Sequence, residues 1–514
     1  MSDHTFPHIP RRADGPPMTY TDNAHGAMVP EAPAIPKPWP HQQDGIDWAL
    51  ARSASYLHLT MGAGKSRIVV DIADESAAMR VLIVCPKSVV ASVWPGQFKQ
   101  WSVRPWAVAA TTLLGSSVAT RIKKAEAIGA KATYERRPCV TVINYDAMRS
   151  KAAIEWLKKQ RWDLCVFDEA QKLKSHTGST SKLAAQLTRK ACKRVVGLSG
   201  TPMPHSPMDI FAQFRAIAPD VFGGSYYRFR ARYAQMGGYK MKEVKGFQHQ
   251  TEMTERMSAV MFSPPGDAVN LNLPPHRHEI RTVDLSPEAR RLYDALNSEV
   301  VAGIEQGIIN PANGLVKLLR MQQLCSGLAV VEEPPPLVGS EPAIDADLIA
   351  RLLAGTKAMR EDVEVCTAKR DALRDILEST DEPVVVFGQF RQDMKSTKAA
   401  CKAADATMSE LSGQANELAE WKAGKTRVLG VQIASGAEGI DLTRARLCVY
   451  LSTGFNMGTY LQSLARVHRP GQTRPVVYYH IHARKTVDDI VWRVLAARGD
   501  LVASVLAQVQ HSAG

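Results

Sequence analysis

Short runs of apolar residues recur along the chain and alternate with segments whose apolar residues follow a helical spacing. The first half contains the runs 81–85, 140–143, 164–167 and 195–198. The second half contains the runs 384–387, 427–431, 447–451 and 476–481. Continuous apolar runs of this length are typical of parallel strands that are buried on both faces of a sheet. We therefore predict an α/β fold with two parallel-sheet lobes in tandem and helical material between them.

The spacing of prolines and helical patterns divides the chain further. Residues 1–40 hold nine prolines, so we expect 1–35 to be a flexible Pro-rich tail. The first lobe is predicted over 36–225, and the second over 366–514. The stretch 226–365 links them: 285–330 has a helical pattern, 332–343 reads as a loop, and 226–283 is rich in Tyr, Met, Lys and Arg without clear periodicity.

The charge balance indicates a polyanionic partner. Lys and Arg number 64 against 51 Asp and Glu, a formal net charge of +13, and an excess of this sign is typical of nucleic-acid binding as well as of simple solubility. The eight cysteines are scattered without a C-x-x-C pair, which favours reduced core thiols over disulfides or zinc ligands. No apolar run approaches the length of a membrane span. We expect a cytoplasmic protein without a membrane partner.

A glycine-rich stretch lies between an apolar strand-like run and a helical pattern. It reads Leu59-Thr60-Met61-Gly62-Ala63-Gly64-Lys65-Ser66. Glycines in this position let the backbone turn its N–H groups toward phosphate oxygens, the lysine reaches the β- and γ-phosphates, and the Ser hydroxyl serves Mg²⁺. Although the strict pattern has Gly where Leu59 stands, the stretch predicts a site for nucleotide phosphates.

Two carboxylates follow the apolar run 164–167, namely Asp168 and Glu169. In open α/β sheets, ligands and catalytic groups gather at the carboxyl ends of strands. There Asp168 could hold Mg²⁺, and Glu169 could orient and deprotonate the attacking water. An N-cap pair for the next helix is the alternative interpretation.

The segment 462–472 carries two arginines three residues apart, Arg466 and Arg469. On a helix they share one face, and Pro470-Gly471 would end that helix. Two guanidinium groups delivered across a cleft to a triphosphate would stabilise the charge of the transition state. A solvated basic helix end is the alternative.

Taken together, the order of these motifs resembles the superfamily-two helicases and, within them, the Swi/Snf-type DNA translocases. The resemblance covers roughly 38–225 and 275–505. It rests on the phosphate loop, on Asp-Glu-Ala-Gln at 168–171, on Ser-Gly-Thr-Pro at 199–202, on 436–442 and on the arginine–glycine–glutamine pattern of 466–472. Gln171 stands where this family usually has His, and Asp441 where Swi/Snf members usually have Asn. The chain length favours a bacterial or phage motor over a chromatin remodeller.

The resemblance implies two RecA-like lobes with ATP and Mg²⁺ in the cleft between them. Residues predicted to bind the nucleotide are Gln42, Met61, Gly62, Ala63, Gly64, Lys65, Ser66 and Asp441, with Ser66 and Asp168 serving the metal. Catalytic roles fall to Lys65, Asp168, Glu169, Arg466 and Arg469. Residues predicted to contact the DNA backbone, or to couple it to ATP, are Pro86, Lys87, Ser88, Asn144, Tyr145, Gly200, Thr201, Ser435 and Gly436.

The function that follows is an ATP-dependent translocase on double-stranded DNA, working with replication or recombination proteins in the cytoplasm, or in the host cytoplasm if phage-encoded. Phosphate contacts carry little sequence information, which suits a motor that must step along any DNA. A strand-separating DNA or RNA helicase remains open because of Gln171 and Asp441. A non-hydrolysing ATP-dependent DNA-binding protein is a lesser alternative.

Overall fold

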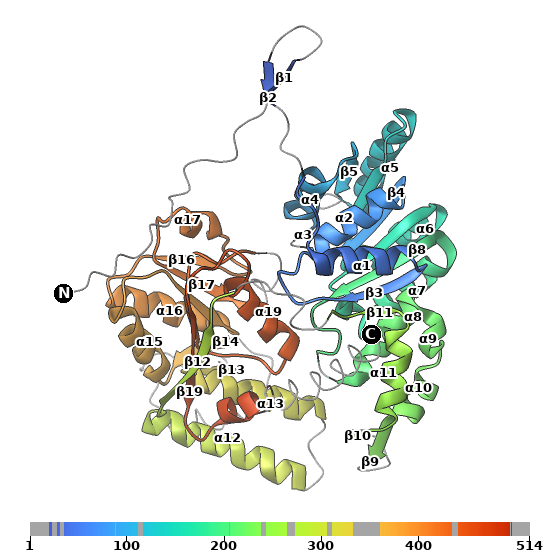
Figure 1. The fold of residues 1–514 in the computed structure, drawn as a ribbon. Helices are drawn as coiled ribbons and strands as arrows, with labels where there is room; N and C mark the ends of the chain where they lie inside the picture. Colours follow the sequence, from blue (N-terminus) through green and yellow to red (C-terminus); the bar gives the residue numbers. More distant parts are fainter. Residues whose placement is uncertain are drawn as a thin grey trace, which may run out of the picture.

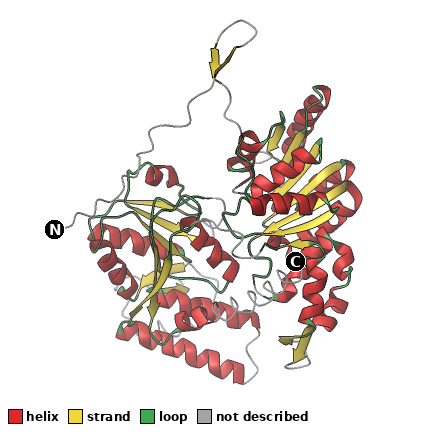
Figure 2. Cartoon of the chain, in the orientation of Figure 1, coloured by secondary structure: helices red, strands yellow, loops and turns green. Residues whose placement is uncertain are grey.

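The computed structural model describes residues 20–22, 28–30, 35–87, 89–110, 117–204, 206–237, 243–264, 273–305, 311–332, 360–433, 440–493 and 495. Two α/β lobes stand side by side, the first coloured blue to green and the second yellow to red (Figure 1). Each lobe has a sheet sandwiched by helices (Figure 2). The predicted fold class, two parallel-sheet lobes in tandem, is confirmed.

The first lobe is built on a seven-stranded sheet in the order β11-β3-β8-β7-β4-β6-β5. Every neighbouring pair is parallel. Four strands coincide with the predicted apolar runs to within a few residues. The strands are β3 (Ala54–His58), β4 (Arg80–Cys85), β5 (Ala107–Ala110), β6 (Cys139–Asn144), β7 (Trp162–Asp168), β8 (Cys192–Ser199) and β11 (Met261–Phe262).

Helices cover both faces of this sheet, which is why its strands are apolar throughout. In β4, Val81, Ile83 and Cys85 join one buried cluster, while Leu82 and Val84 join the other. The helices are α1 (Pro40–Leu50), α2 (Lys65–Glu75), α3 (Val89–Ser92), α4 (Trp94–Trp101), α5 (Val118–Tyr134), α6 (Lys151–Lys159), α7 (Ser179–Ala191) and α8 (Ile210–Ile217).

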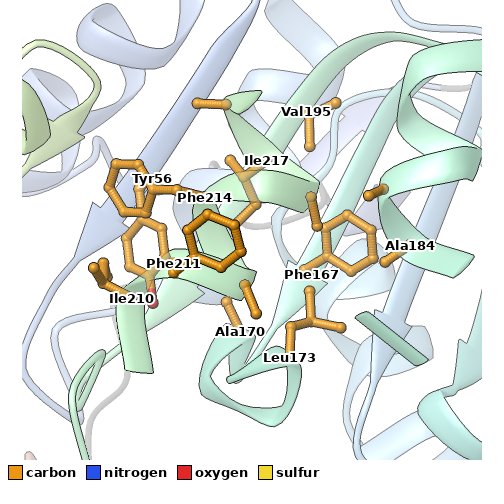
Figure 3. Close-up of a cluster of buried hydrophobic side chains, with 14 of the residues drawn as sticks. Tyr56, Phe167, Ala170, Leu173, Ala184, Val195, Ile210, Phe211, Phe214 and Ile217 are labelled. Carbon is orange, nitrogen blue, oxygen red and sulfur yellow. The ribbon is translucent and has the colours of Figure 1, made fainter. Parts of the chain in front are cut away.

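Aromatic residues of α8 anchor the helical layer to the sheet (Figure 3). Phe214 stacks on Tyr56 of β3 with 5.6 Å between ring centroids, and the Tyr56 hydroxyl donates to Gln213 Oε1 at 2.6 Å. This packing fixes α8 against β3, which pairs with β8, and both strands lead into candidate site segments.

The stretch 219–258 adds a small subdomain beside α8, most of it within the segment 226–283 whose fold the sequence left open. It consists of α9 (Pro219–Phe222), α10 (Tyr226–Tyr233), the antiparallel strands β9 (Ala234–Gly237) and β10 (Glu243–Phe247), and α11 (Gln250–Ser258). After it, β11 returns the chain to the first sheet.

The second lobe contains a six-stranded parallel sheet in the order β12-β19-β18-β15-β17-β16. Its strands are β12 (His276–Val283), β15 (Val384–Gly388), β16 (Met408–Leu411), β17 (Val428–Gln432), β18 (Leu447–Tyr450) and β19 (Val476–Ala483). Its helices include α15 (Ala368–Glu378), α16 (Arg391–Ala403), α17 (Leu418–Lys422) and α19 (Met457–Val467).

Two long helices, α12 (Pro287–Glu305) and α13 (Pro311–Cys325), confirm the helical pattern of 285–330. They pack under the second lobe (Figure 1), next to the antiparallel pair β13 (Leu328–Glu332) and β14 (Arg360–Glu364). In the predicted tail, β1 (Tyr20–Asp22) pairs with β2 (Met28–Pro30). The predicted loop 332–343 lies almost wholly outside the described residues. Within the described part of the chain, no helix is both long and apolar enough to cross a bilayer.

Candidate active site

The glycine-rich stretch forms the connection between β3 and α2. Gly62 and Gly64 have φ angles of +86° and +80°, a region that residues with a side chain rarely adopt. Gly64 is the N-cap of α2 and leaves the cap without a side-chain hydrogen bond. The first N–H groups of α2 therefore point out of the helix end without an internal acceptor, which is the arrangement that binds phosphate.

Helix α1 is tied to this loop through one carbonyl. The Gln42 side-chain amide donates to Ala63 O at 3.1 Å, and His41 Nε2 lies 3.0 Å from the same oxygen. A Cβ at position 64 would overlap the Gln42 amide. Gln42, predicted to recognise the base, thus contacts the phosphate loop, and glycine is the residue that leaves room for it.

Lys65, the first residue of α2, is held at the mouth of the loop. Its Nζ donates to Leu59 O at 2.9 Å and to Thr60 O at 3.1 Å. Burial lowers the pKa of Lys65; the charges of Glu169 and Asp168 oppose this shift, and the charge of Arg466 adds to it. The lysine therefore lies within electrostatic reach of both carboxylates and of the second lobe.

The two carboxylates stand at the carboxyl end of β7. Trp94 of α4 donates its indole N–H to Asp168 Oδ2 at 3.2 Å. Burial, and after it the neighbouring charge of Glu169, raises the pKa of Asp168 to about 7. Glu169 has φ +53°, an unfavourable value for a residue with a side chain that is found most often at functional sites.

A polar chain connects these carboxylates to the end of β8. Gln171 donates to Glu169 Oε2 at 2.5 Å and accepts from the Ser199 hydroxyl at 2.6 Å. The Ser199 hydroxyl also accepts from the Thr201 backbone N–H at 2.9 Å. The Asp-Glu-Ala-Gln and Ser-Gly-Thr-Pro segments, whose bonded residues Gln171 and Ser199 are 28 positions apart, are thus one hydrogen-bonded unit.

The second lobe reaches this unit through α19. Gln462 donates to Glu169 Oε2 at 3.2 Å across the cleft. One turn further along the helix, Arg466 is buried and acts on Lys65 as described above. Arg469 donates to Ile440 O at 3.1 Å, and among the described residues its buried Nε has no hydrogen-bond partner. The prediction that both arginines share one helix face, ended by Pro470-Gly471, is wrong: α19 ends at Val467, so Arg466 lies in its last turn and Arg469 in the segment that follows it.

Pro470 touches the phosphate loop itself. A Cβ placed on Gly62 would lie 2.7 Å from Pro470 Cδ and 3.8 Å from Arg469 Cβ. Asp441 lies nearby. Although burial alone would raise the pKa of Asp441, hydrogen bonds from Thr443, and then the charge of Arg469, hold it below its ordinary value.

The donor set fits a magnesium-bound triphosphate. The loop amides, Lys65, Arg466 and Arg469 are the cationic and N–H groups that phosphates take. The Ser66 hydroxyl and the Asp168 carboxylate are oxygen ligands of the kind that Mg²⁺ prefers. Burial first, and then the adjacent charge of Glu169, raises the pKa of Asp168, and a bound cation would offset both by favouring the ionised carboxylate.

The residues predicted at the DNA side differ in their exposure to solvent. Lys87 is exposed, whereas Pro86, Asn144, Tyr145 and Thr201 are buried. Gly200 packs against the phosphate loop: a Cβ there would lie 3.3 Å from Leu59 O. Ser88, Ser435 and Gly436 lie outside the described residues.

The buried members of this set contact the active site. The Tyr145 hydroxyl donates to Asp168 O at 2.8 Å. Thr201 faces the start of α19, since a Cβ on Gly458 would lie 3.4 Å from its Oγ1. Tyr145 and Thr201 thus link the predicted DNA side to Asp168 and to α19, respectively. Trp94 is buried against Asp168.

Three contacts at the site were missed at the level of sequence: His41 on the loop carbonyl, Trp94 on Asp168, and Gln462 on Glu169. His41 adjoins the predicted Gln42, and Gln462 lies one turn before Arg466. Their positions next to predicted residues were the available signals. The indole of Trp94 lies 74 residues from its partner, and no local pattern indicates that pairing.

Two family models match the chain. The model described as an SNF2-related domain matches residues 41–328, and the model described as the helicase conserved C-terminal domain matches residues 368–471. The first match alone spans more than half of the chain.

Similar proteins include a phage protein and eukaryotic helicases. The putative protein p41 of Acyrthosiphon pisum secondary endosymbiont phage 1 is 25% identical over 488 residues, covering 88% of this chain and 94% of that protein. The Mus musculus DNA annealing helicase and endonuclease ZRANB3 is 22% identical, covering 91% of this chain but 40% of that protein. The Caenorhabditis elegans homologue of SWI/SNF-related subfamily A-like protein 1 is 25% identical, covering 92% and 62%.

Two solved structures align over most of the chain. The Sulfolobus solfataricus SWI2/SNF2 ATPase core in complex with dsDNA is 19% identical, with a TM-score of 0.38 and coverage of 93% of this chain and 96% of that one. The Pyrococcus furiosus Hef helicase domain is 14% identical, with a TM-score of 0.49 and coverage of 90% and 98%.

Proposed function

The chain belongs to the SNF2-related family of DNA-dependent ATPases, and on that premise we propose that it is a translocase that moves along duplex DNA by hydrolysing ATP between its lobes. One observation carries the proposal. Gln462 of the second lobe donates to Glu169 of the first at 3.2 Å; Gln462 lies on α19, which also carries Arg466 and leads directly into Arg469. Because both lobes contribute residues to the site, a change in the distance between the lobes opens or closes it.

In the proposed reaction the chain acts mainly by positioning and by electrostatics. The N–H groups of the phosphate loop and Lys65 hold the β- and γ-phosphates. Ser66 and Asp168 would hold Mg²⁺, which neutralises phosphate charge when bound. Glu169 accepts a proton from the attacking water, and Gln171 and Gln462 orient its carboxylate through the bonds to Oε2.

The charge that develops on the transferring phosphoryl group is stabilised from the second lobe. Arg466 and Arg469 present planar guanidinium groups that pair with phosphate oxygens in a bidentate way. Since these groups come from the other side of the cleft, hydrolysis requires closed lobes. DNA lying across both lobes would favour closure, which links ATP turnover to DNA binding.

The direct test is ATP hydrolysis by the purified chain with blunt duplex DNA, single-stranded DNA or RNA as stimulant. We expect blunt duplex DNA to stimulate turnover. Stimulation by RNA alone would contradict the proposal. Steady displacement of a triplex-forming strand from a duplex, dependent on ATP, would measure translocation itself.

A strand-separating helicase is the second candidate, favoured by Gln171 in place of the usual histidine and by its direct bond to Glu169. A fluorescent unwinding assay on a forked duplex separates the two, because a translocase moves along the duplex and leaves the strands paired. A protein that binds ATP without hydrolysing it would lack a catalytic group, whereas Lys65, Glu169 and both arginines are present.

A further inference from the structure

Helix α10, in the subdomain beside α8, presents an aromatic and basic face. Its sequence is Tyr-Tyr-Arg-Phe-Arg-Ala-Arg-Tyr. The Tyr227 side chain is 74% exposed, and the Arg230 guanidinium lies over its ring at 5.7 Å from the centroid. Arg228 is exposed next to it. Besides Arg230, the Tyr227 ring meets the Tyr226 ring edge-on at 6.3 Å between centroids, and most of its surface faces solvent.

The opposite face of α10 fixes this arrangement in place. Phe229 and Tyr233 are buried, and Phe229 packs on Phe211 of α8 at 5.2 Å and on Phe222 of α9 at 5.0 Å between centroids. The Ser225 hydroxyl caps the helix by accepting from the Arg228 N–H at 3.4 Å. Because the apolar side is anchored, the exposed side chains are held on a rigid support.

Positive charge surrounds the helix. Tyr226 stacks on His176 with ring centroids 3.5 Å apart. Burial lowers the pKa of His176, and the charges of Arg215, Arg230 and Lys182 lower it further. These cations come from α7, α8 and α10, so three elements converge on one basic surface. The negative charge of Asp209 acts on Tyr226 within this surface.

Arg232 belongs to a different arrangement, although it lies on the same helix. It pairs with Glu252 of α11, and Arg256 pairs with the same carboxylate at 3.1 Å. The charge of Arg232 is therefore balanced within the subdomain. This residue provides a matched control for Arg228.

We propose that the surface formed by Tyr227, Arg228, Arg230 and Lys182 binds a single-stranded segment of DNA adjoining the duplex on which the motor acts. An exposed aromatic ring in a basic setting stacks with an unpaired base while the cations hold the phosphate backbone. In a duplex both faces of each base are already covered, so Tyr227 would have no base to stack on. The proposal rests on the proposed DNA-dependent function and adds to it a preference for branched or tailed DNA.

The test compares a blunt duplex with the same duplex carrying a single-stranded tail of about 12 nucleotides, the length that such surfaces accommodate. Binding is measured by fluorescence anisotropy with the full chain. We expect Tyr227→Ala to weaken binding to the tailed duplex by about tenfold, the loss of one base stack, with binding to the blunt duplex unchanged. Arg228→Ala should lower the salt dependence on the tailed duplex by about 0.7 in slope.

Two variants serve as controls. Arg232→Ala removes a charge of the same helix that is already paired, and Tyr134→Ala removes a tyrosine that is 90% exposed on α5, far from α10 (Figure 1). Both should bind the two substrates as the wild type does. Equal losses on blunt and tailed DNA for Tyr227→Ala, or no loss on either, would overturn the proposal.

Stimulation of ATP hydrolysis by blunt duplex keeps this test separate from that of the proposed function. Tyr227→Ala should retain wild-type turnover with blunt duplex. If blunt duplex fails to stimulate the wild type, the proposed translocase is wrong, while the tail-dependent binding still decides the role of α10.

Discussion

The two lobes share one architecture, but they differ in what lies at the N-terminus of the helix that follows a central strand. In the first lobe, β3 leads through a glycine loop into α2, whose N-terminus has no side-chain cap. In the second lobe, β15 leads into α16, and the Asp393 carboxylate occupies the helix end. Asp393 Oδ2 accepts from Phe390 N at 2.8 Å and from the Ser452 hydroxyl at 2.6 Å.

This difference explains how one fold used twice gives one phosphate site. Asp393 is 1% exposed, and a Cβ on Gly388 would overlap it, so the second connection is filled by the protein's own anion. A helix N-terminus favours a negative group beside it. At the N-terminus of α2 in the first lobe no side chain caps the helix, so that position can take a ligand's phosphate. The second lobe contributes arginines instead, Arg466 from α19 and Arg469 from the segment just after that helix.

The largest effect should come from the second lobe's share of the site. We expect Arg469→Lys, and likewise Arg466→Lys, to lower DNA-stimulated turnover by about 10³-fold or more, because an ammonium cannot reproduce the planar fork of a guanidinium. Single-turnover hydrolysis measures the loss. Lys425→Arg, on the surface of the same lobe, is a control. Full activity of either variant would show that the arginine replaced does not take part in ATP hydrolysis.

The first lobe's share is tested by Glu169→Gln. We expect turnover to fall on the order of 10²–10⁴-fold, the usual cost of removing a positioned base, while binding of a fluorescent ATP analogue is retained. Glu155→Gln on α6, an exposed carboxylate, should change neither quantity. Near wild-type turnover in Glu169→Gln would refute its assignment as the base.

The filled helix end of the second lobe can be emptied. We expect Asp393→Ala to destabilise that lobe by about 3 kcal/mol, because two buried donors lose their acceptor. Urea unfolding followed by circular dichroism measures this loss, and Asp393→Asn, which keeps the shape, should cost less. Nucleotide should still bind with a stoichiometry of one. A second bound nucleotide would show that the Asp393 carboxylate alone keeps the second lobe from binding nucleotide.

A smaller effect concerns a property that the lobes share. Burial lowers the pKa of His480 to about 3 and that of His58 to about 4, so both are neutral when folded. The unfolded chain binds their protons below pH 6.5, and stability is therefore lost as pH falls. Each histidine should account for about 2 kcal/mol of loss at pH 5.

Replacing His480 tests this, since its ring stacks on Tyr450 at 4.9 Å and a phenyl ring can take that place. Thermal unfolding of His480→Phe and wild type should be compared at pH 8 and at pH 5. We expect the variant to lose less stability than the wild type between the two values. An identical loss in both proteins would exclude His480 as a source of the acid sensitivity.

Much of the fold follows from local pattern. The apolar runs locate β4, β6, β7 and β8, as well as β15, β17, β18 and β19, because strands buried on both faces must be apolar throughout. The edge strands are less visible. β12 reads His-Arg-His-Glu-Ile-Arg-Thr-Val and is largely exposed, so its sequence shows neither an apolar run nor a clear alternation.

The residues of the candidate site can be named from sequence patterns, and their roles stay predictions; the contacts that they make do not follow from those patterns. Lys65, Asp168 and Arg466 stand in recognisable patterns. The bond between Gln462 and Glu169 joins positions 293 apart in sequence, and the role of Trp94 depends on how α4 packs on β7. Contacts of this kind arise from the tertiary fold, so a single sequence does not indicate which partner each side chain meets.

The contact between Gly62 and Pro470 has a mechanical consequence. The second lobe contacts the first at the phosphate loop. The absence of a side chain at position 62 allows Pro470 to approach this closely. One methyl group added there would act as a spacer, keeping Arg466 and Arg469 back from the phosphate loop. The residue whose positive φ shapes the loop is therefore also the residue that limits how closely the second lobe can approach it.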